Sequence, residues 1–268
     1  MARLESREIM GFLPIGQEHQ EAILSLVKPA TSSHKLLDPF AGEGTFLKVA
    51  ADAWQMTAYA NELDGERAQE CINTFGVTQA VRSDALRLRA SNQAFSCLWV
   101  NPPYDIDKTA KNSKRVEFTM LRHSWKWAQE GGLVLWAVYQ HHLTTEAMSF
   151  LAKNSRQVDV WAIPGKHLGE YDQIIVAAVV GHQPDPSALY QQLEAQKLQL
   201  QQQKTTIQSQ GEHIAKQQAS IHQLNQRQSA IETKLTTSTQ ALNESQSLIS
   251  QSQERLSQSR ARAEKLAL

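Results

Sequence analysis

The stretch that decides the fold runs Lys35-Leu36-Leu37-Asp38-Pro39-Phe40-Ala41-Gly42-Glu43-Gly44-Thr45. Its apolar start predicts a short strand over residues 35–40, and the glycines that follow break that strand. Gly42 and Gly44 let the backbone bend tightly and approach a ligand where any Cβ would collide. Turns of this kind serve many nucleotide sites, although this one lacks the third glycine of G-x-G-x-x-G and the lysine of a phosphate-binding loop. The alternative is an ordinary tight turn.

Strands and helices alternate along the chain on both sides of this turn. Helices are predicted over residues 17–27, 45–54, 65–75, 116–129 and 144–153, and strands over residues 35–40, 56–61, 80–83, 95–100, 133–139, 157–163 and 174–181. Such alternation favours a parallel sheet with helices on both faces. Only a loop separates the last two strands, so they should pair antiparallel. We expect a doubly wound α/β fold whose mostly parallel sheet closes with an antiparallel hairpin.

The composition of the chain changes near residue 184. All Trp, Phe and Tyr residues lie at or before Tyr190, and no proline follows Pro186. We therefore predict a globular domain over residues 1–183, a linker over residues 184–188 and a Gln/Ser-rich helix over residues 189–268. In that last segment an aliphatic residue recurs every seven positions, at residues 193, 200, 207, 214, 221, 235, 242, 249 and 256. This spacing favours a coiled coil for self-association or for docking a protein partner, over a disordered tail.

The net formal charge is zero, but charge is distributed unevenly. Residues 187–268 carry +3, which leaves −3 on the rest of the chain. A domain that grips long duplex DNA unaided usually has a basic face, so the overall charge does not support tight binding to nucleic acid. No apolar run approaches the roughly 18 residues of a membrane span, and the start MARLESREIMGF lacks an apolar signal segment. We expect a cytoplasmic protein without membrane contact, associated with the nucleoid if its substrate is DNA.

The cysteine and histidine residues show no spacing that is typical of a metal-binding site. Cys71 and Cys97 are isolated, and we expect both to be buried, reduced thiols. His141 and His142 follow the fifth predicted strand, where adjacent side chains point to opposite faces. We therefore predict no metal site and assign the two histidines no role.

Acidic residues lie at the ends of the first three predicted strands: Asp38 near the end of the first, Glu62 at the end of the second and Asp84 just past the third. Glu62 ends the second strand, 20 residues beyond Gly42, where a carboxylate can accept hydrogen bonds from both hydroxyls of a ribose. Asp84 follows the third strand, where a carboxylate or the neighbouring amide can recognise an adenine edge. Each acidic residue taken alone is more often a helix cap or a solvated loop residue. Three such residues, each just past a predicted strand, indicate a nucleoside-like ligand.

The segment Leu98-Trp99-Val100-Asn101-Pro102-Pro103-Tyr104 follows the fourth strand. Its prolines fix φ and lack backbone donors, which leaves their carbonyls as acceptors. The Asn101 amide oxygen and the Pro102 carbonyl can both accept hydrogens from one NH2 group, which turns the nitrogen lone pair towards an incoming methyl group. Tyr104 offers a flat face on which a planar base can stack. The alternative is a rigid proline turn after a strand.

Four motifs follow one another along the chain: DPFAGEGT, NELD, SDAL and NPPY. Together they resemble the class I S-adenosylmethionine-dependent amino-methyltransferases of the gamma arrangement. The resemblance covers roughly residues 10–183. The resemblance implies S-adenosyl-L-methionine as cofactor. Asp38, Gly42 and Gly44 would then cradle its methionine part, Glu62 its ribose and Asp84 its adenine. The cofactor site would be completed by Phe40, Thr45, Leu63, Ala85 and Asn101. The leader Gly11-Phe12-Leu13-Pro14 would close over the methionine end.

The same resemblance implies N6 of adenine in DNA as the methyl acceptor, with the base flipped or unpaired at Asn101, Pro102, Pro103 and Tyr104. Tyr171, in the loop between the last two strands, would stack on that base, with Trp161 as the alternative. Enzymes of this kind usually add a recognition domain, and no segment of this sequence has the size and globular composition expected of one. Specificity would then come from loops such as residues 105–115 or from a partner. An RNA adenine, a protein glutamine amide and a catalytically idle coiled-coil scaffold therefore stay open as alternatives.

Overall fold

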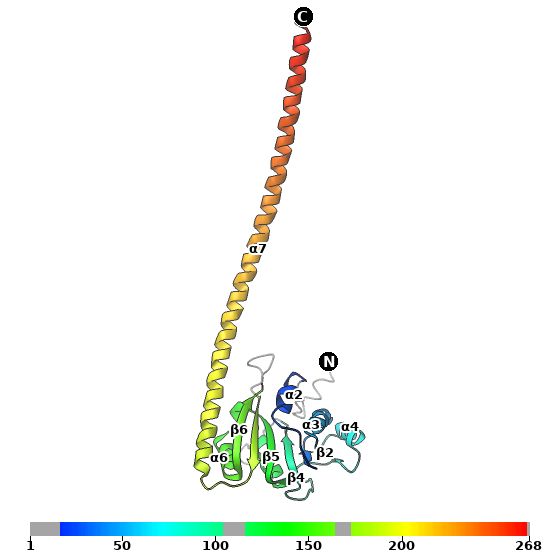
Figure 1. The fold of residues 1–268 in the computed structure, drawn as a ribbon, viewed down its shortest axis with the longest axis vertical. Helices are drawn as coiled ribbons and strands as arrows, with labels where there is room; N and C mark the ends of the chain where they lie inside the picture. The colour runs from blue at the N-terminus through cyan, green and yellow to red at the C-terminus, as the bar shows by residue number, and fades with distance from the viewer. Residues whose placement is uncertain (1–16, 104–115, 164–172, 267–268) are drawn as a thin grey trace. The chain divides into compact units, whose positions relative to one another are not determined.

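The structure, a computed structural model, describes residues 17–103, 116–163 and 173–266. It divides into two units, Met1–Thr206 and Ile207–Leu268. The first unit contains the sheet and the helices that pack on it (Figure 1). Within the described residues, no helix is both long and apolar enough to pass through a membrane.

A seven-stranded sheet with the order β3-β2-β1-β4-β5-β7-β6 forms the centre of the first unit. Its strands are β1 (Lys35–Asp38), β2 (Thr57–Glu62), β3 (Ala80–Arg82), β4 (Phe95–Val100), β5 (Ala128–Tyr139), β6 (Ser155–Ala162) and β7 (Gln173–Val180). The first five strands pair in parallel, whereas β7 lies antiparallel to both β5 and β6. The expected doubly wound fold with an antiparallel hairpin is confirmed, and β7 lies between β5 and β6.

The helices follow the strands as the alternation predicts. They are α2 (Gln17–Leu24), α3 (Thr45–Trp54), α4 (Gly65–Phe75), α5 (Val116–Ser124), α6 (Thr145–Asn154) and α7 (Pro186–Leu266), with 3-10 turns η1 (Trp125–Trp127) and η2 (Gln140–His142). Asp64 begins α4 by accepting hydrogen bonds from the backbone N–H groups of Glu66 and Arg67. Capping of this kind satisfies donors that the first helical turn leaves without partners.

The prediction was wrong at the start of β5. A helix was expected to continue to residue 129 and to end at Gly131 and Gly132, but α5 ends at Ser124 and β5 already begins at Ala128. Gly131 adopts a left-handed φ of 74°, and the pairing of β4 with β5 shifts register at this point. A Cβ on Gly132 would lie 3.0 Å from the Ser96 carbonyl oxygen. The two glycines therefore bend a strand and let it approach its neighbour.

Both faces of the sheet are buried because neighbouring residues of its central strands enter different cores. One core takes Leu37, Leu98 and Trp136 and packs them against α5 and α6. The opposite core takes Leu36 and Trp99 and packs them against α3, α4 and α2. Each large side chain that is fully removed from water contributes about 1.5–3 kcal/mol. This two-sided burial explains the continuous apolar runs of the parallel strands.

Helix α7 starts at Pro186, inside the segment predicted to be a linker. Its first turns belong to the first unit, since Leu189 and Leu193 are buried in the core beside α6. The Gln192 side-chain amide donates a hydrogen bond of 3.1 Å to the Val158 carbonyl of β6. Leu193, expected in the coiled-coil stripe, therefore serves the core of the domain. The aliphatic residues from Ile207 onwards lie in the second unit.

Candidate active site

The parallel strands β1, β2, β3 and β4 end at one edge of the sheet. This places Asp38, Glu62 and Asn101 at or just past the ends of three neighbouring strands, with Asp84 two residues beyond β3. The glycine turn after β1 lies between Glu62 on one side and the Asn101 segment on the other, because β1 pairs with both β2 and β4. Ligands of doubly wound sheets bind at this edge.

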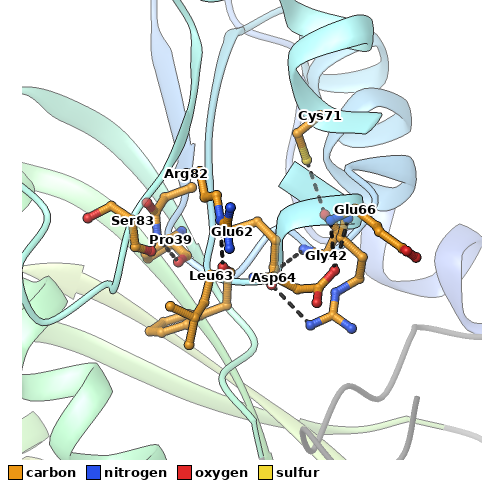
Figure 2. A network of polar contacts seen from close by, with 12 residues as sticks. Pro39, Gly42, Glu62, Leu63, Asp64, Glu66, Cys71, Arg82 and Ser83 are labelled. Carbon is orange, nitrogen blue, oxygen red and sulfur yellow. Dashed lines mark hydrogen bonds and ion pairs between the residues drawn. The ribbon is translucent and has the colours of Figure 1, made fainter. Parts of the chain in front are cut away.

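Glu62 connects the glycine turn to the start of α4 (Figure 2). Its Oε2 accepts a hydrogen bond of 2.9 Å from the Gly42 backbone N–H. Its Oε1 accepts one of 2.9 Å from the Asp64 N–H and one of 3.0 Å from the Arg67 guanidinium. Glu62 is 6% exposed, so these contacts are formed out of water. Buried charge-assisted hydrogen bonds of this kind are among the stronger ones in proteins.

The glycine turn needs glycine at both of its key positions. Gly42 and Gly44 adopt left-handed φ angles of 57° and 77°. A Cβ on Gly44 would lie 2.7 Å from the Phe75 ring and 3.1 Å from the Cys71 sulfur. The Cys71 thiol also donates to the Gly42 carbonyl at 3.2 Å. The turn therefore packs tightly against α4 on its inner side.

Asn61 is a site residue that the sequence analysis did not identify. It is 1% exposed, and its side-chain amide donates to the Pro39 and Ser83 carbonyls, both at 3.0 Å. The backbone carbonyl of Asn61 accepts a hydrogen bond of 2.9 Å from the Ala41 backbone N–H. Asn61 thereby ties the turn after β1 to the turn after β3 across the end of β2. The only local signal for this role is a polar residue at the end of an apolar strand.

Asp38 is a buried acid close to a second one. Its Oδ1 accepts a hydrogen bond of 2.8 Å from the Phe40 backbone N–H. Burial raises the pKa of this carboxyl well above its ordinary value; the Phe40 hydrogen bond lowers it, and the negative charge of Glu62 raises it further. A cation bound at this edge of the sheet would favour the ionised form of Asp38.

The predicted adenine-recognition residues have contrasting surroundings. Asp84 is partly exposed, with its Oδ1 accepting from the Leu86 N–H at 2.9 Å and its Oδ2 lying 3.8 Å from Arg87 Nε. Ala85 is buried. Leu63, next to the buried Glu62, is 56% exposed and offers an apolar surface beside the carboxylate. An apolar face next to a hydrogen-bonding acid suits the mixed character of a nucleoside.

The remaining predicted residues fall into two groups. Asn101 is half-buried, Pro102 is buried, Phe40 is half-buried against the core and Thr45 is exposed at the start of α3. Trp161, the alternative stacking residue, is 39% exposed on β6. Other predicted features lie outside the described residues: Tyr104, Tyr171, the leader Gly11-Phe12-Leu13-Pro14 and the loop 105–115.

His141 and His142 do not point to opposite faces of a strand, because β5 ends at Tyr139 and both lie in η2. Their ring centroids are 4.0 Å apart. His142 Nδ1 lies 3.2 Å from Glu117 Oε1, and both side chains are buried. This pair joins the first turn of α5 to η2, the turn that follows β5. Among the described residues, no group of His, Cys, Asp and Glu side chains is arranged to hold a metal ion.

Residues 1–197 match an uncharacterised methyltransferase family (DUF6094). The chain belongs to this family. No curated protein matches this methyltransferase by sequence.

Solved structures with a similar fold include several methyltransferases. The type I restriction-modification system methyltransferase subunit from Streptococcus thermophilus is 14% identical with a TM-score of 0.49, over 69% of this chain and 49% of its own. TYW2 from M. jannaschii, in complex with AdoMet, is 14% identical with a TM-score of 0.46, over 64% and 79%. A SAM-dependent O-methyltransferase from Thermotoga maritima is 14% identical with a TM-score of 0.47, over 65% and 69%. The methyltransferase spans about half the length of the Streptococcus protein.

Replacing Asp38 by Asn is expected to stabilise the methyltransferase at neutral pH and to have less effect near pH 4. A raised pKa means that the stability contributed by protonated Asp38 is fully present below the ordinary value of 3.8 and is lost as pH rises through the folded-state pKa. Asparagine keeps the acceptor for the Phe40 N–H and cannot ionise. Urea unfolding between pH 4 and 8 should show the free energies of wild type and Asp38→Asn diverging as pH rises. The control is Asp52→Asn, at an exposed α3 position paired with Lys48. Parallel curves of unfolding free energy against pH for wild type and Asp38→Asn would contradict a raised pKa for Asp38.

Proposed function

We propose that this methyltransferase transfers a methyl group to N6 of adenine in DNA, on a base that is flipped out or unpaired. The observation that carries the proposal is the placement of the glycine turn, held by Glu62, beside β4, the strand that Asn101 and Pro102 follow. A methyl donor in the turn and an amine at Asn101 would then lie next to each other. Bringing the two reactants together in this way provides much of the rate enhancement in a transfer reaction.

S-adenosyl-L-methionine is the methyl donor, and it supplies an electrophilic methyl group on a positively charged sulfur. The chain provides a fitting environment for a cation, because Asp38 and Glu62 are both buried and repel each other. A positive charge nearby relieves that repulsion and favours the ionised Asp38. The left-handed glycines allow the backbone of the turn to approach the methionine part closely.

The contacts of Glu62 limit how it can hold the ribose. An ionised carboxylate offers about four acceptor positions. The N–H groups of Gly42 and Asp64 and the Arg67 guanidinium take three of them. One position is left for a ribose hydroxyl while Arg67 keeps its place. We therefore infer that Glu62 binds one hydroxyl directly, and that a second hydroxyl bond requires Arg67 to move. Leu63 would cover an apolar face of the nucleoside.

The target amine would be held by Asn101 and Pro102. Adenine N6 is conjugated with its ring and is a weak nucleophile. Accepting both of its hydrogens, through the Asn101 amide oxygen and the Pro102 carbonyl, directs its lone pair at the methyl group. The new N–C bond would form as the C–S bond breaks, which releases S-adenosylhomocysteine, and the nitrogen would then lose one proton to water. Donors and acceptors fixed in advance stabilise the charge that develops on the way.

DNA that is single-stranded or mismatched is the favoured substrate form. Extruding a paired base costs a few kcal/mol, which phosphate contacts normally offset. Residues 1–186 carry a formal charge of −3, so they supply few such contacts. RNA adenine and protein glutamine amides present a similar NH2 group and are the competing substrates of the same chemistry.

Changing Glu62 to Gln is expected to weaken S-adenosylmethionine binding by about tenfold or more, because hydrogen bonds to a charged group contribute about 1.5–3 kcal/mol. Calorimetric titration measures the dissociation constant, and thermal unfolding checks that the variant is folded. The control is Glu70→Gln, an exposed position on α4, which should bind as wild type does. Equal binding by Glu62→Gln and wild type, or no binding by either, would refute the cofactor site.

Asn101→Ala should lower methyl transfer at least about tenfold, since loss of one fixed hydrogen-bonding group typically costs two to three orders of magnitude. Cofactor affinity should fall much less than turnover, because the Asn101 side-chain amide acts on the amine, although the resemblance also places Asn101 at the cofactor site. Asn101→Asp keeps an acceptor oxygen and should retain more activity than Asn101→Ala. Asn73→Ala, exposed on α4, is the matched control. If Asn101→Ala keeps more than about a tenth of wild-type turnover, the amine is held elsewhere.

The acceptor can be identified by offering labelled S-adenosylmethionine with duplex DNA, single-stranded DNA, RNA and protein extract in parallel. We expect the label in adenine of DNA, faster on single-stranded or mismatched DNA than on duplex, with steep inhibition by salt. Asn101→Ala gives the background incorporation of labelled methyl groups into each substrate. Label found only in RNA or protein would show that RNA or protein is the methyl acceptor. That result would refute DNA as the substrate and leave the proposed reaction at the NH2 group unchanged. Label in none of them, with cofactor binding intact, would favour the scaffold alternative.

A further inference from the structure

The second unit presents a stripe of aliphatic side chains to solvent. Between Ile207 and Leu256 the large apolar side chains of α7 are 36–66% exposed. The repeat can be written as heptads with positions abcdefg, in which Ile207 occupies position a. Each position a from Ile207 to Ile221, and again from Leu235 to Leu256, is then aliphatic. Position d is polar at both ends of the stripe, with Gln210 and Gln217 on one side and serines from Ser238 onwards on the other. An apolar stripe of this length on an isolated helix requires a partner helix.

We propose that the partner is α7 of a second copy of this chain, and that the two helices pair parallel and in register. The proposal rests on the stripe alone and does not depend on the proposed methyl transfer. In a parallel pair each position a faces position a of the other helix, and each d faces d. Aliphatic layers then alternate with Gln or Ser layers, so the large apolar side chains meet each other.

An antiparallel pair is disfavoured by the same pattern. In that arrangement position a of one helix faces position d of the other. The isoleucines and leucines at a would then lie against Gln or Ser along most of the stripe, and polar groups would be buried beside apolar ones without partners, which is costly. The segregation of aliphatic residues to a and polar residues to d is therefore an orientation signal.

The middle of the stripe specifies the register. Gln228 is the polar residue at position a, and Leu224 and Ile231 fill the neighbouring d positions. A single polar residue at position a selects the register in which it meets its own counterpart. Sliding the helices by one heptad would place Gln228 against Ile221 or Leu235. In the single chain, the Gln228 side chain donates to Glu232 at 2.9 Å, one turn away.

The charges beside Gln228 complement each other across a parallel pair. Arg227 occupies position g and Glu232 the following position e. In a parallel, in-register dimer, position g of one helix lies next to the following e of the other, so Arg227 and Glu232 pair twice by symmetry. This self-complementarity is the property that fits a second copy better than an unrelated helix.

Single cysteines introduced into the 268-residue chain test orientation and register together. Ser238→Cys and Ser252→Cys lie at position d, and each should meet its own counterpart in a parallel dimer. Ser250→Cys, at the outward position b, is the matched control. The native Cys71 and Cys97 do not interfere, because both are buried and burial raises the pKa of each thiol to about 12. Cross-linking under mild oxidant is read on a non-reducing gel, and light scattering gives the mass in solution.

A dimer by light scattering, with covalent dimers from both Ser238→Cys and Ser252→Cys and none from Ser250→Cys, supports the proposal. An antiparallel dimer can bring only one position onto itself, so cross-linking at a single d site overturns the orientation. A monomeric chain, or equal cross-linking at all three sites, overturns the pairing. Arg227→Glu should weaken the dimer in a dilution series, and the double variant Arg227→Glu/Glu232→Arg should restore it. No recovery in the double variant would reject the register.

Discussion

The carboxylate of Glu62 accepts hydrogen bonds from three groups and so joins the glycine turn after β1 to the start of α4: the Gly42 N–H, the Asp64 N–H and the Arg67 guanidinium. Without an acceptor there, the Gly42 N–H would be left buried without a partner, which costs about 1–3 kcal/mol. The left-handed turn and the helix start would lose their common support. Asn61 performs the matching task on the other side of β2, where it joins the turns after β1 and β3. The shape of the candidate site thus depends on two neighbouring residues at the end of one strand.

Much of the fold could be predicted because its periodicities are local. The bounds of α3 and α4 were predicted to the residue, and the apolar runs marked the parallel strands. The start of β5 was predicted wrongly because a glycine pair ends helices and also bends strands, and local sequence does not distinguish the two. Leu193 was predicted to belong to the coiled-coil stripe because a seven-residue spacing identifies residues on one face of a helix. The spacing does not show whether that face packs against another helix or against the core of the domain.

The positions of the candidate site residues could be predicted, and the contacts that connect them could not. The strand pattern predicted Asp38, Glu62 and Asn101 at the ends of strands, with Gly42 in the turn after the first, and the structure places them at one edge of the sheet. The contact between Asn61 and the Pro39 carbonyl joins residues 22 apart, and no local pattern encodes it. Strand geometry was assumed for His141 and His142, which follow the predicted strand, whereas both lie in the 3-10 turn η2. The contact of His142 with Glu117 was therefore not expected. Pairings between distant segments arise only once the sheet is assembled.

The division of α7 between a packed start and an exposed remainder has an evolutionary consequence. Leu189 and Leu193 fill the core, and the family match extends to residue 197. From Ile207 to Ser259 every side chain is exposed, so the fold of the first unit places no packing demand on its identity. Under the pairing proposed above, selection in this segment would act on the phase of the stripe. Insertions or deletions of whole heptads preserve that phase, whereas a change of one or two residues rotates the stripe around the helix. Related chains would then be free to differ in the length of this segment by multiples of seven while drifting among Gln, Ser and Thr at the remaining positions.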